Sequence, residues 1–167
     1  NRNYEMAAPM IIAKTGWTTS DLLRGMDQNL EVQRDFDLVS ILIGVNNQYQ
    51  GKLITEYEEE LRQIFRRAIN HSKTMEKGVF AVSIPDYGYT PFGSSNQEKI
   101  SAEIDRFNQV FKRVADEFGV VFYNITPISR NSSNPELVAS DGLHPSALQY
   151  QLWVEQYISQ VAEKLPN

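Results

Sequence analysis

Residues 36–69 read FDLVSILIGVNNQYQGKLITEYEEELRQIFRRAI, and this stretch decides the fold class because it holds a strand, a polar loop and a helix in succession. Residues 36–43 are largely apolar and partly β-branched, which predicts a short strand with both faces covered. A loop with Gly44 and Asn46 follows. From about Leu53 the apolar residues recur every three or four positions, which is typical of an amphipathic helix. The stretch is therefore one βα unit.

The same order of strand and helix recurs on both sides of this unit. Its regular alternation predicts parallel strands joined by right-handed crossovers, and hence an α/β fold with a three-layer α/β/α sandwich. No repeat or linker interrupts the pattern, so we expect a single domain over residues 1–167. The further strands are expected over residues 9–13, 79–84 and 120–125, and the further helices over about 20–30, 100–118 and 145–164.

The composition excludes several classes of protein. Of the 167 residues, 41% are hydrophobic and 22% are charged, and none is cysteine, which excludes disulfides, thiolate metal sites and a cysteine nucleophile. A net charge of −5 without a basic run gives no reason to expect a nucleic acid partner. Because no apolar run approaches the ~20 residues that span a bilayer, no stable membrane insertion is expected. The compartment, cytoplasmic, periplasmic or secreted, is left open.

A candidate catalytic pair lies just before the final helix. In an open parallel sheet, ligands bind beyond the carboxyl ends of the strands, so the loops there are the ones that matter. Asp141 and His144 precede Pro145, which suits the first turn of a helix. A carboxylate three residues before a histidine can hold one imidazole nitrogen as a donor, so that the other serves as a general base. A helix cap beside a surface histidine is an equally good interpretation.

Two other loops supply candidate donors to a developing oxyanion. The side-chain amide of Asn46 follows a buried strand, and one such donor is typically worth ~3 kcal/mol in the transition state. Gly44 lets the backbone approach a ligand closely, and the backbone N–H of Gly16 is a further candidate donor. Glycine and asparagine are also the favoured turn residues, and a turn is the simpler interpretation of each position taken alone.

Trp17, Asn47, Asp86 and Tyr87 lie in the same loops and are candidates for contact with a substrate. Packing is the alternative for Trp17, and a simple turn is the alternative for Asp86. No metal site is expected, because the chain has 2 histidines and no carboxylates clustered at ligand spacing. No cofactor is expected either, since no glycine-rich phosphate-binding motif is present.

Taken in order, four segments resemble the SGNH, or GDSL-like, hydrolase family in its bacterial esterase form. The resemblance implies that His144 is the catalytic base and Asp141 its orienting partner. It also implies that the Gly16 backbone and the Asn46 side chain form the oxyanion hole, in a flavodoxin-like sheet of order 2-1-3-4-5. The four segments are AKTGWTTSDLL at 13–23, LVSILIGVNNQYQGK at 38–52, VFAVSIPDYGYTPFG at 79–93 and SDGLHPS at 140–146.

One block of that family, the Gly-Asp-Ser segment that carries the nucleophile, is absent from the 167 residues. In the family it follows a first strand at the centre of the sheet. Neighbouring strands lie ~4.8 Å apart, so without that strand its two neighbours would be separated by about twice this distance. We therefore expect a fold whose first strand is absent from this chain, and an upstream N-terminal segment of ~30 residues or more that carries the serine.

The activity implied by the resemblance is metal-free hydrolysis of a carboxylic ester through an acyl-serine. The expected substrate is a small-molecule ester, either an acetylated sugar or a short-chain or lysophospholipid acyl group. One alternative is a catalytically inactive module that binds a carbohydrate in the same cleft. Another is a flavodoxin-like flavin binder, which predicts a phosphate-binding Ser/Thr loop after the first strand.

Overall fold

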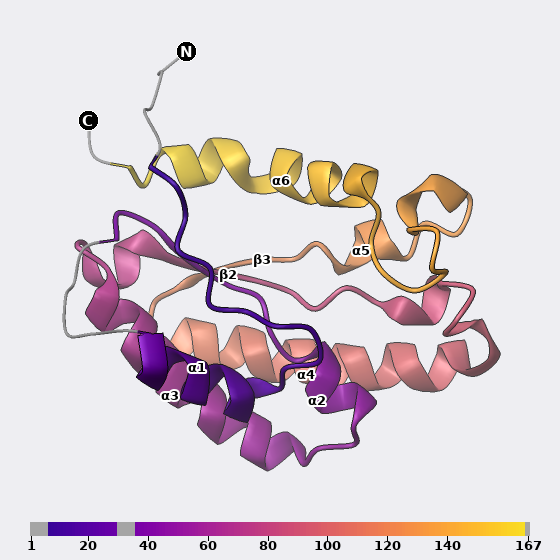
Figure 1. Ribbon diagram of the computed structural model, residues 1–167, viewed down its shortest axis with the longest axis horizontal. Coiled ribbons are helices and arrows are strands. Elements are labelled where there is room, and N and C mark those ends of the chain that lie inside the picture. Colours follow the sequence, from indigo (N-terminus) through magenta and orange to yellow (C-terminus); the bar gives the residue numbers. More distant parts are fainter. Residues whose placement is uncertain (1–6, 30–35, 166–167) are drawn as a thin grey trace.

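The computed structural model describes residues 7–29 and 36–165, and its centre is a parallel sheet of three strands in the order β1-β2-β3 (Figure 1). The strands are β1 (Val39–Ile41), β2 (Val79–Val82) and β3 (Val121–Tyr123). Val39 of β1 pairs with Val79 of β2, and residues of β2 pair in turn with β3. The connections between these strands contain helices, as parallel pairing requires. The expected parallel sheet is confirmed.

Helices cover both faces of the sheet (Figure 1). The helices α1 (Thr19–Asn29), α3 (Ile54–His71) and α4 (Gln97–Glu117) pack together below it, with α3 in contact with both α1 and α4. Helix α6 (Ala147–Ala162) lies across the opposite face. This arrangement confirms the three-layer α/β/α sandwich.

The side chains of β2 supply a core on each face. Val79 and Ala81 belong to the larger cluster with α1, α3 and α4, whereas Phe80 and Val82 belong to a second cluster under Trp153 of α6. Successive strand residues point to opposite faces, and all four residues of β2 are buried. The continuous apolar run of the sequence is therefore the signature of a strand covered on both sides.

Three of the expected helices appear close to their expected bounds. Helix α4 spans residues 97–117 where 100–118 was expected, and α3 begins at Ile54. Helix α6 begins after Ser146, whose hydroxyl accepts a hydrogen bond from the Gln149 N–H at 3.2 Å. The first helix, expected over about 20–30, is described from residue 19 to residue 29, and its expected last residue lies outside the described residues.

The strand expected over residues 9–13 is not present in the structure, and this prediction was wrong. Residues 7–14 form neither helix nor strand, and no backbone hydrogen bond joins them to β1 in the described part of the chain. Pro9 has no N–H to donate, and Ile11 is 76% exposed. A strand needs a partner for its backbone groups, and the edge of β1 away from β2 is unpaired among the described strands. The other three strands are shorter than the apolar runs that predicted them.

Short helical elements occur in the connecting segments, and three of them, α2, η2 and α5, contribute residues to the candidate site. The short elements are α2 (Val45–Tyr49), η1 (Met75–Gly78), η2 (Tyr87–Tyr89), η3 (Ser94–Asn96), α5 (Thr126–Ser129) and η4 (Pro135–Leu137).

None of the helices among the described residues is long and apolar enough to cross a bilayer.

Candidate active site

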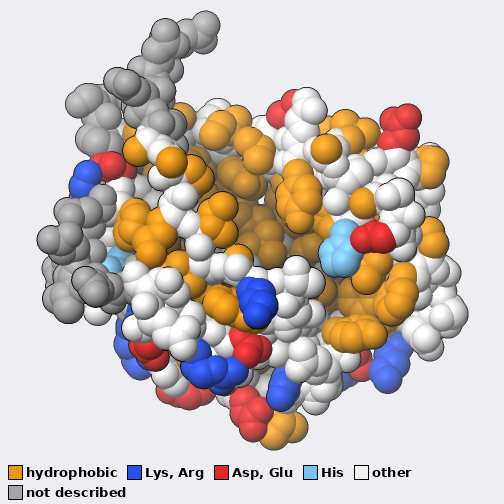
Figure 2. All heavy atoms as spheres, in the orientation of Figure 1, with side chains coloured by type: hydrophobic (Ala, Val, Ile, Leu, Met, Phe, Trp, Pro, Cys, Tyr) orange, Lys and Arg blue, Asp and Glu red, His pale blue; other side chains and the backbone are white. Residues whose placement is uncertain are grey.

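A cavity of about 580 Å³ opens beyond the carboxyl ends of the strands. Figure 2 shows a hollow on this face of the molecule with hydrophobic side chains over its walls. The cavity brings together loops that are far apart in the sequence. Its lining comes from residues 12–17, Leu22, 42–46, Tyr49, 85–87, Thr90, Phe92, Ser129, 143–145, Gln149, Tyr150 and Trp153. Six of the candidate residues from the sequence analysis line the cavity: Gly16, Trp17, Asn46, Asp86, Tyr87 and His144.

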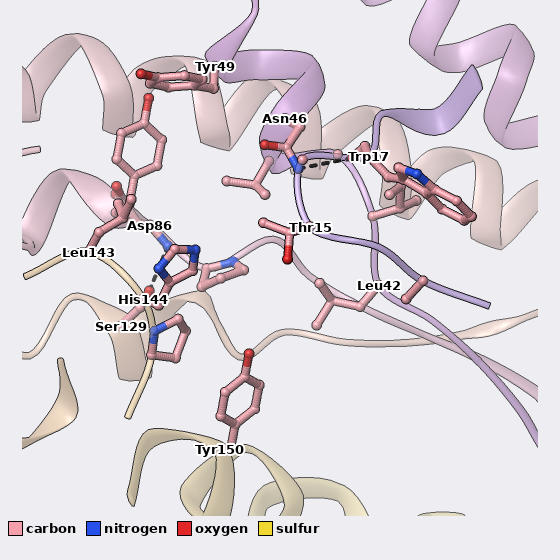
Figure 3. Close-up of a pocket in the computed structure, with 18 of the residues that line it drawn as sticks. Thr15, Trp17, Leu42, Asn46, Tyr49, Asp86, Ser129, Leu143, His144 and Tyr150 are labelled. Atoms are coloured by element: carbon pink, nitrogen blue, oxygen red, sulfur yellow. Dashed lines mark hydrogen bonds between the residues drawn. The ribbon is translucent and has the colours of Figure 1, made fainter. Parts of the chain in front are cut away.

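His144 lines this cavity (Figure 3), and its imidazole forms a hydrogen bond with Asp141. The Nδ1 atom of His144 lies 2.6 Å from Oδ2 of Asp141. The other carboxylate oxygen of Asp141 accepts the backbone N–H groups of His144 and Leu143, both at 2.9 Å. These backbone bonds, followed by the bond to the imidazole, lower the pKa of Asp141 to about 2. A carboxylate that stays ionised keeps the proton of a neutral His144 on Nδ1, which leaves Nε2 as an acceptor.

Backbone hydrogen bonds hold the turn that carries this pair. The His144 carbonyl accepts the Ala139 N–H at 2.8 Å, and the Ser146 N–H donates to the Leu137 carbonyl at 2.9 Å. The left-handed residue Gly142 (φ 73°) closes the turn. Its carbonyl accepts the backbone N–H of Phe92 at 3.1 Å, which joins the turn to the loop after β2. The imidazole is therefore positioned by the start of α6 and by a second loop.

Gly44 brings the loop after β1 against the core. Its φ of 126° disfavours any side chain, and a Cβ atom there would lie 2.6 Å from the Tyr57 hydroxyl and 2.7 Å from Ile84. The buried Tyr57 hydroxyl donates to the Ile43 carbonyl at 3.2 Å. This close approach sets the start of α2, whose first turn carries Asn46 into the cavity wall.

Asn46 joins the two loops that carry the candidate oxyanion donors. Its side-chain Nδ2 donates to the Trp17 carbonyl at 3.0 Å, which uses one of its two N–H groups (Figure 3). Gly16 has a φ of 85°, and no atom lies within 4 Å of where its Cβ would be, so the backbone conformation alone favours glycine. Among the described residues, the Gly16 N–H donates to no protein acceptor. Two N–H groups therefore remain for a ligand.

Trp17 and Asn47 have packing roles. The Trp17 indole lies so close to Gly25 of α1 that a Cβ there would be 2.4 Å from it, although Trp17 also lines the cavity. Asn47 is buried and does not line the cavity. Its Oδ1 accepts the Thr19 N–H at 3.0 Å, and its Nδ2 donates to the Thr19 hydroxyl at 2.6 Å. The structure thus separates Asn47 from the substrate contacts proposed for it and uses it to anchor α1.

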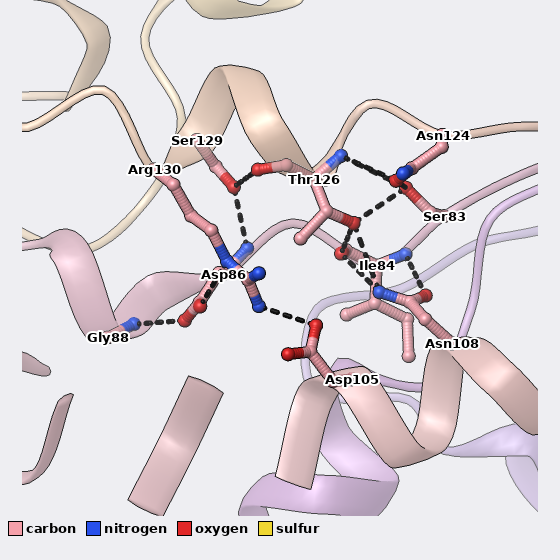
Figure 4. A network of polar contacts seen from close by, with 10 residues as sticks. All are labelled: Ser83, Ile84, Asp86, Gly88, Asp105, Asn108, Asn124, Thr126, Ser129 and Arg130. Atoms are coloured by element: carbon pink, nitrogen blue, oxygen red, sulfur yellow. Dashed lines mark hydrogen bonds and ion pairs between the residues drawn. The ribbon is translucent and has the colours of Figure 1, made fainter. Parts of the chain in front are cut away.

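Asp86 lies at the cavity wall, but its carboxylate points into a polar network (Figure 4). It accepts the Gly88 N–H at 2.8 Å and the Nε of Arg130 at 2.9 Å, and the Asp86 side chain has no exposed surface. Arg130 also donates to Asp105 of α4 at 2.6 Å. The network holds the loop after β2 against α4 and α5, so Asp86 positions Tyr87 and is not itself open to a ligand.

A second set of bonds fixes the carboxyl ends of β2 and β3 (Figure 4). The Ser83 hydroxyl accepts the N–H groups of Ile125 and Thr126 at 2.9 and 3.1 Å. Asn108 of α4 pairs with both backbone groups of Ile84, at 2.8 and 3.0 Å. These bonds hold the backbone that leads into Pro85 and Asp86 of the cavity lining.

Sequence reasoning did not single out several residues of the cavity. Ser129 lines the cavity, but its hydroxyl donates to the Thr126 carbonyl at 2.6 Å and accepts the Asp86 N–H at 2.8 Å. Tyr150 points its hydroxyl toward the cavity from α6, and Trp153 lies one helical turn further. The sequence does indicate these two residues, because aromatic side chains three residues apart on a helix that begins just after His144 lie on the same face. Arg130 had none, because its partners lie 25 and 44 residues away.

Among residues 7–29 and 36–165, no group of three or more His, Cys, Asp or Glu side chains is arranged to hold a metal ion. The charged or ionisable lining residues other than tyrosine are Lys14, Asp86 and His144, and the Asp86 charge is offset by Arg130. The geometry offers an oriented imidazole, two N–H donors and a largely uncharged cavity, which together suit acyl transfer on a neutral substrate.

Comparison with known proteins agrees with this geometry. The model of the GDSL-like lipase/acylhydrolase family matches residues 2–152. A search of curated proteins finds no match. Similar solved structures include a lipase/acylhydrolase from Enterococcus faecalis, with a TM-score of 0.69 and 18% identity over 90% of this chain and 73% of that one. An acetylxylan esterase from Geobacillus stearothermophilus has a TM-score of 0.68 and 20% identity over 91% and 71% of the two chains. A GDSL-like lipase from Bacteroides thetaiotaomicron has a TM-score of 0.68 and 17% identity over 90% of this chain and 73% of that one.

Proposed function

Because this chain belongs to the GDSL-like lipase/acylhydrolase family, we propose that it hydrolyses carboxylic esters with His144 as the general base and Asp141 as its orienting partner. The observation that carries the proposal is the 2.6 Å contact between the two side chains at the edge of the cavity that Asn46 and Gly16 also line. We infer that the substrates are small neutral esters with an acetyl or short acyl group, because the cavity lining carries few charges.

The proposed reaction runs through an acyl-serine. A serine hydroxyl attacks the ester carbonyl while Nε2 of His144 accepts its proton. The Gly16 N–H and the second N–H of Asn46 donate to the oxyanion of the tetrahedral intermediate. His144 returns the proton to the leaving alcohol, and a water molecule then repeats the sequence to release the acid. Asp141 stabilises the imidazolium and stays ionised throughout.

We propose that an upstream segment supplies this serine as an extended strand beside β1. The edge of β1 away from β2 makes no backbone hydrogen bond to the described residues, so a strand ~4.8 Å away could pair with it. Leu42, next to that edge, is 43% exposed and lines the inner part of the cavity together with Ile12. Trp153 is buried there, and its indole N–H has no partner in the described part of the chain. A backbone carbonyl of the added strand would satisfy it.

Trapping the nucleophile tests this proposal. The full-length protein is treated with a fluorophosphonate, whose phosphorus bonds to the serine oxygen as fluoride leaves and His144 takes the proton. We expect one adduct, mapped by mass spectrometry to a serine upstream of residue 1, and no adduct in the His144→Ala variant. An adduct on Ser129 would overturn the assigned nucleophile. Absence of both an adduct and any ester hydrolysis would overturn the enzyme proposal and favour a non-catalytic binding module.

A further inference from the structure

Three aromatic rings meet at the outer wall of the cavity. Tyr49 comes from α2, Tyr87 from η2 and Phe92 from the loop that follows, and we call them the aromatic cluster. Their ring centroids lie 6.1, 6.2 and 6.4 Å apart in the three pairs. Tyr49 is nevertheless 60% exposed and Phe92 is 52% exposed. Large aromatic side chains that contact one another and remain open to solvent beside a cavity mark a surface that binds a ligand.

The aromatic cluster is fixed in place next to His144. The Phe92 N–H donates to the Gly142 carbonyl in the catalytic turn at 3.1 Å. The Thr90 hydroxyl donates to the Tyr87 carbonyl at 2.7 Å, and a Cβ on Gly93 would lie only 2.1 Å from that carbonyl. The loop is therefore tightly packed, and the rings are held before any ligand arrives. A preformed surface loses little conformational entropy on binding.

The charges around the cavity define the ligand further. Lys14 is the one lining cation among the described residues, and the lining carboxylate, Asp86, is bonded to Arg130. A cationic group would have no free carboxylate to pair with, and Lys14 is the one lining group that could pair with an anion. Neither charge belongs to the aromatic cluster, so the part of the ligand bound there should be neutral, with an apolar face for the rings and polar edges for solvent and for the two tyrosine hydroxyls. A long acyl chain fits these requirements poorly, because it offers no polar group to the two tyrosine hydroxyls.

We propose that the aromatic cluster is a carbohydrate subsite, in which a pyranose ring of the alcohol part of the ester stacks on Tyr49 and Phe92. Sugar rings combine an apolar C–H face with a rim of hydroxyl groups, so they match a half-exposed aromatic wall. Figure 3 draws Tyr49 across the cavity from Tyr150, with His144 between them. The ester carbonyl of a sugar bound at the wall can thus face His144. As an assignment of the alcohol, this inference rests on the proposed function.

Binding of unesterified sugars tests the subsite without any reaction. Xylotriose and cellotriose are titrated calorimetrically into the full-length protein and its Tyr49→Ala and Phe92→Ala variants. We expect saturable binding of at least one sugar, weakened at least about fivefold by each substitution. Leu53→Ala removes a side chain that is 62% exposed outside the cavity, and it should leave binding unchanged. Absence of saturable binding, or equal weakening in the Leu53→Ala variant, would overturn the subsite.

A kinetic comparison separates this inference from the proposed function. The ratio of kcat/KM for acetylated xylotriose to kcat/KM for p-nitrophenyl acetate should fall at least about fivefold in Tyr49→Ala and Phe92→Ala. An unchanged ratio would contradict a sugar contact. Displacement of the sugars by decanoate, with decanoate binding lost in Phe92→Ala, would assign the cluster to an acyl chain and overturn the proposal. If no ester is hydrolysed at all, the proposed function fails while the calorimetric result still decides the subsite.

Discussion

The side-chain amide of Asn46 donates to the backbone carbonyl of Trp17 at 3.0 Å. This bond joins the loop after β1 to the loop that contains Gly16, so one residue both connects the candidate oxyanion hole and contributes a donor to it. Its second N–H remains available for a ligand.

Replacing Asn46 by alanine should therefore affect the chemical step. Removal of one oxyanion donor typically lowers kcat by about 10²–10³-fold. We expect a loss of this size on p-nitrophenyl acetate with little change in KM. Gln50→Ala removes a longer, exposed contact of 3.4 Å to the Gly16 carbonyl in the same region and should change kcat less than about threefold. A similar small effect in Asn46→Ala would show that Asn46 is not an oxyanion donor.

Asp141 should give the folded state a pH-dependent contribution. Its pKa is lowered from the ordinary 3.8 to about 2, mainly by the two backbone N–H bonds and then by His144. A depressed carboxyl pKa stabilises the fold above the unfolded value, and this contribution is lost as the pH falls through about 2. The difference in urea midpoint between the full-length protein and its Asp141→Asn variant should be constant from pH 7 to about 5 and should shrink toward pH 2. A difference that does not vary with pH would contradict the pairing.

Gly44→Ala should destabilise the protein more than a comparable change elsewhere. The added Cβ would lie 2.6 Å from the Tyr57 hydroxyl at a φ of 126°, so both the clash and the backbone conformation are unfavourable. We expect a loss of about 2–4 kcal/mol in the free energy of unfolding. Gly51 also has a positive φ, of 65°, but no atom lies within 4 Å of its Cβ position. Gly51→Ala should cost only about 1 kcal/mol, and equal losses would exclude the clash.

Arg130→Ala should be strongly destabilising because it leaves the buried Asp86 carboxylate with no cationic partner. Breaking a buried ion pair in this way costs about 3–5 kcal/mol, and the partial exposure of Arg130 places the expected value at the lower end. The matched control is Lys73→Ala, which breaks an exposed pair with Asp37 and should cost less than about 1 kcal/mol. Denaturant unfolding measures both, and similar small losses would show that the network does not hold the loop.

Local patterns in the sequence predicted the helices and the contact between Asp141 and His144. The apolar spacing of α4 predicted its bounds to within three residues, because helix formation and burial depend on residues a turn apart. Asp141 and His144 were predictable for the same reason, since a tight turn lets side chains three residues apart meet. Gly44 was expected to let the backbone approach a ligand, whereas the structure shows a close approach to Tyr57 and Ile84.

Long-range contacts explain what the sequence did not reveal. The strand expected over residues 9–13 needs a neighbour that the described residues do not provide. Asn46 and Asn47 are adjacent, yet only the packing of α2 turns one to the cavity and the other to Thr19. The role of Asp86 depends on Arg130, 44 residues away, and no local pattern links the two.

Turnover by the His144→Ala variant tests the central claim most directly. We expect kcat on p-nitrophenyl acetate to fall by about 10²–10⁴-fold, the usual contribution of a general base, in a full-length protein with unchanged stability. His71→Ala, which alters the other histidine at the end of α3, should retain its turnover. If His144→Ala hydrolyses the ester as fast as the unmodified protein, His144 is not the base and the proposed mechanism is wrong.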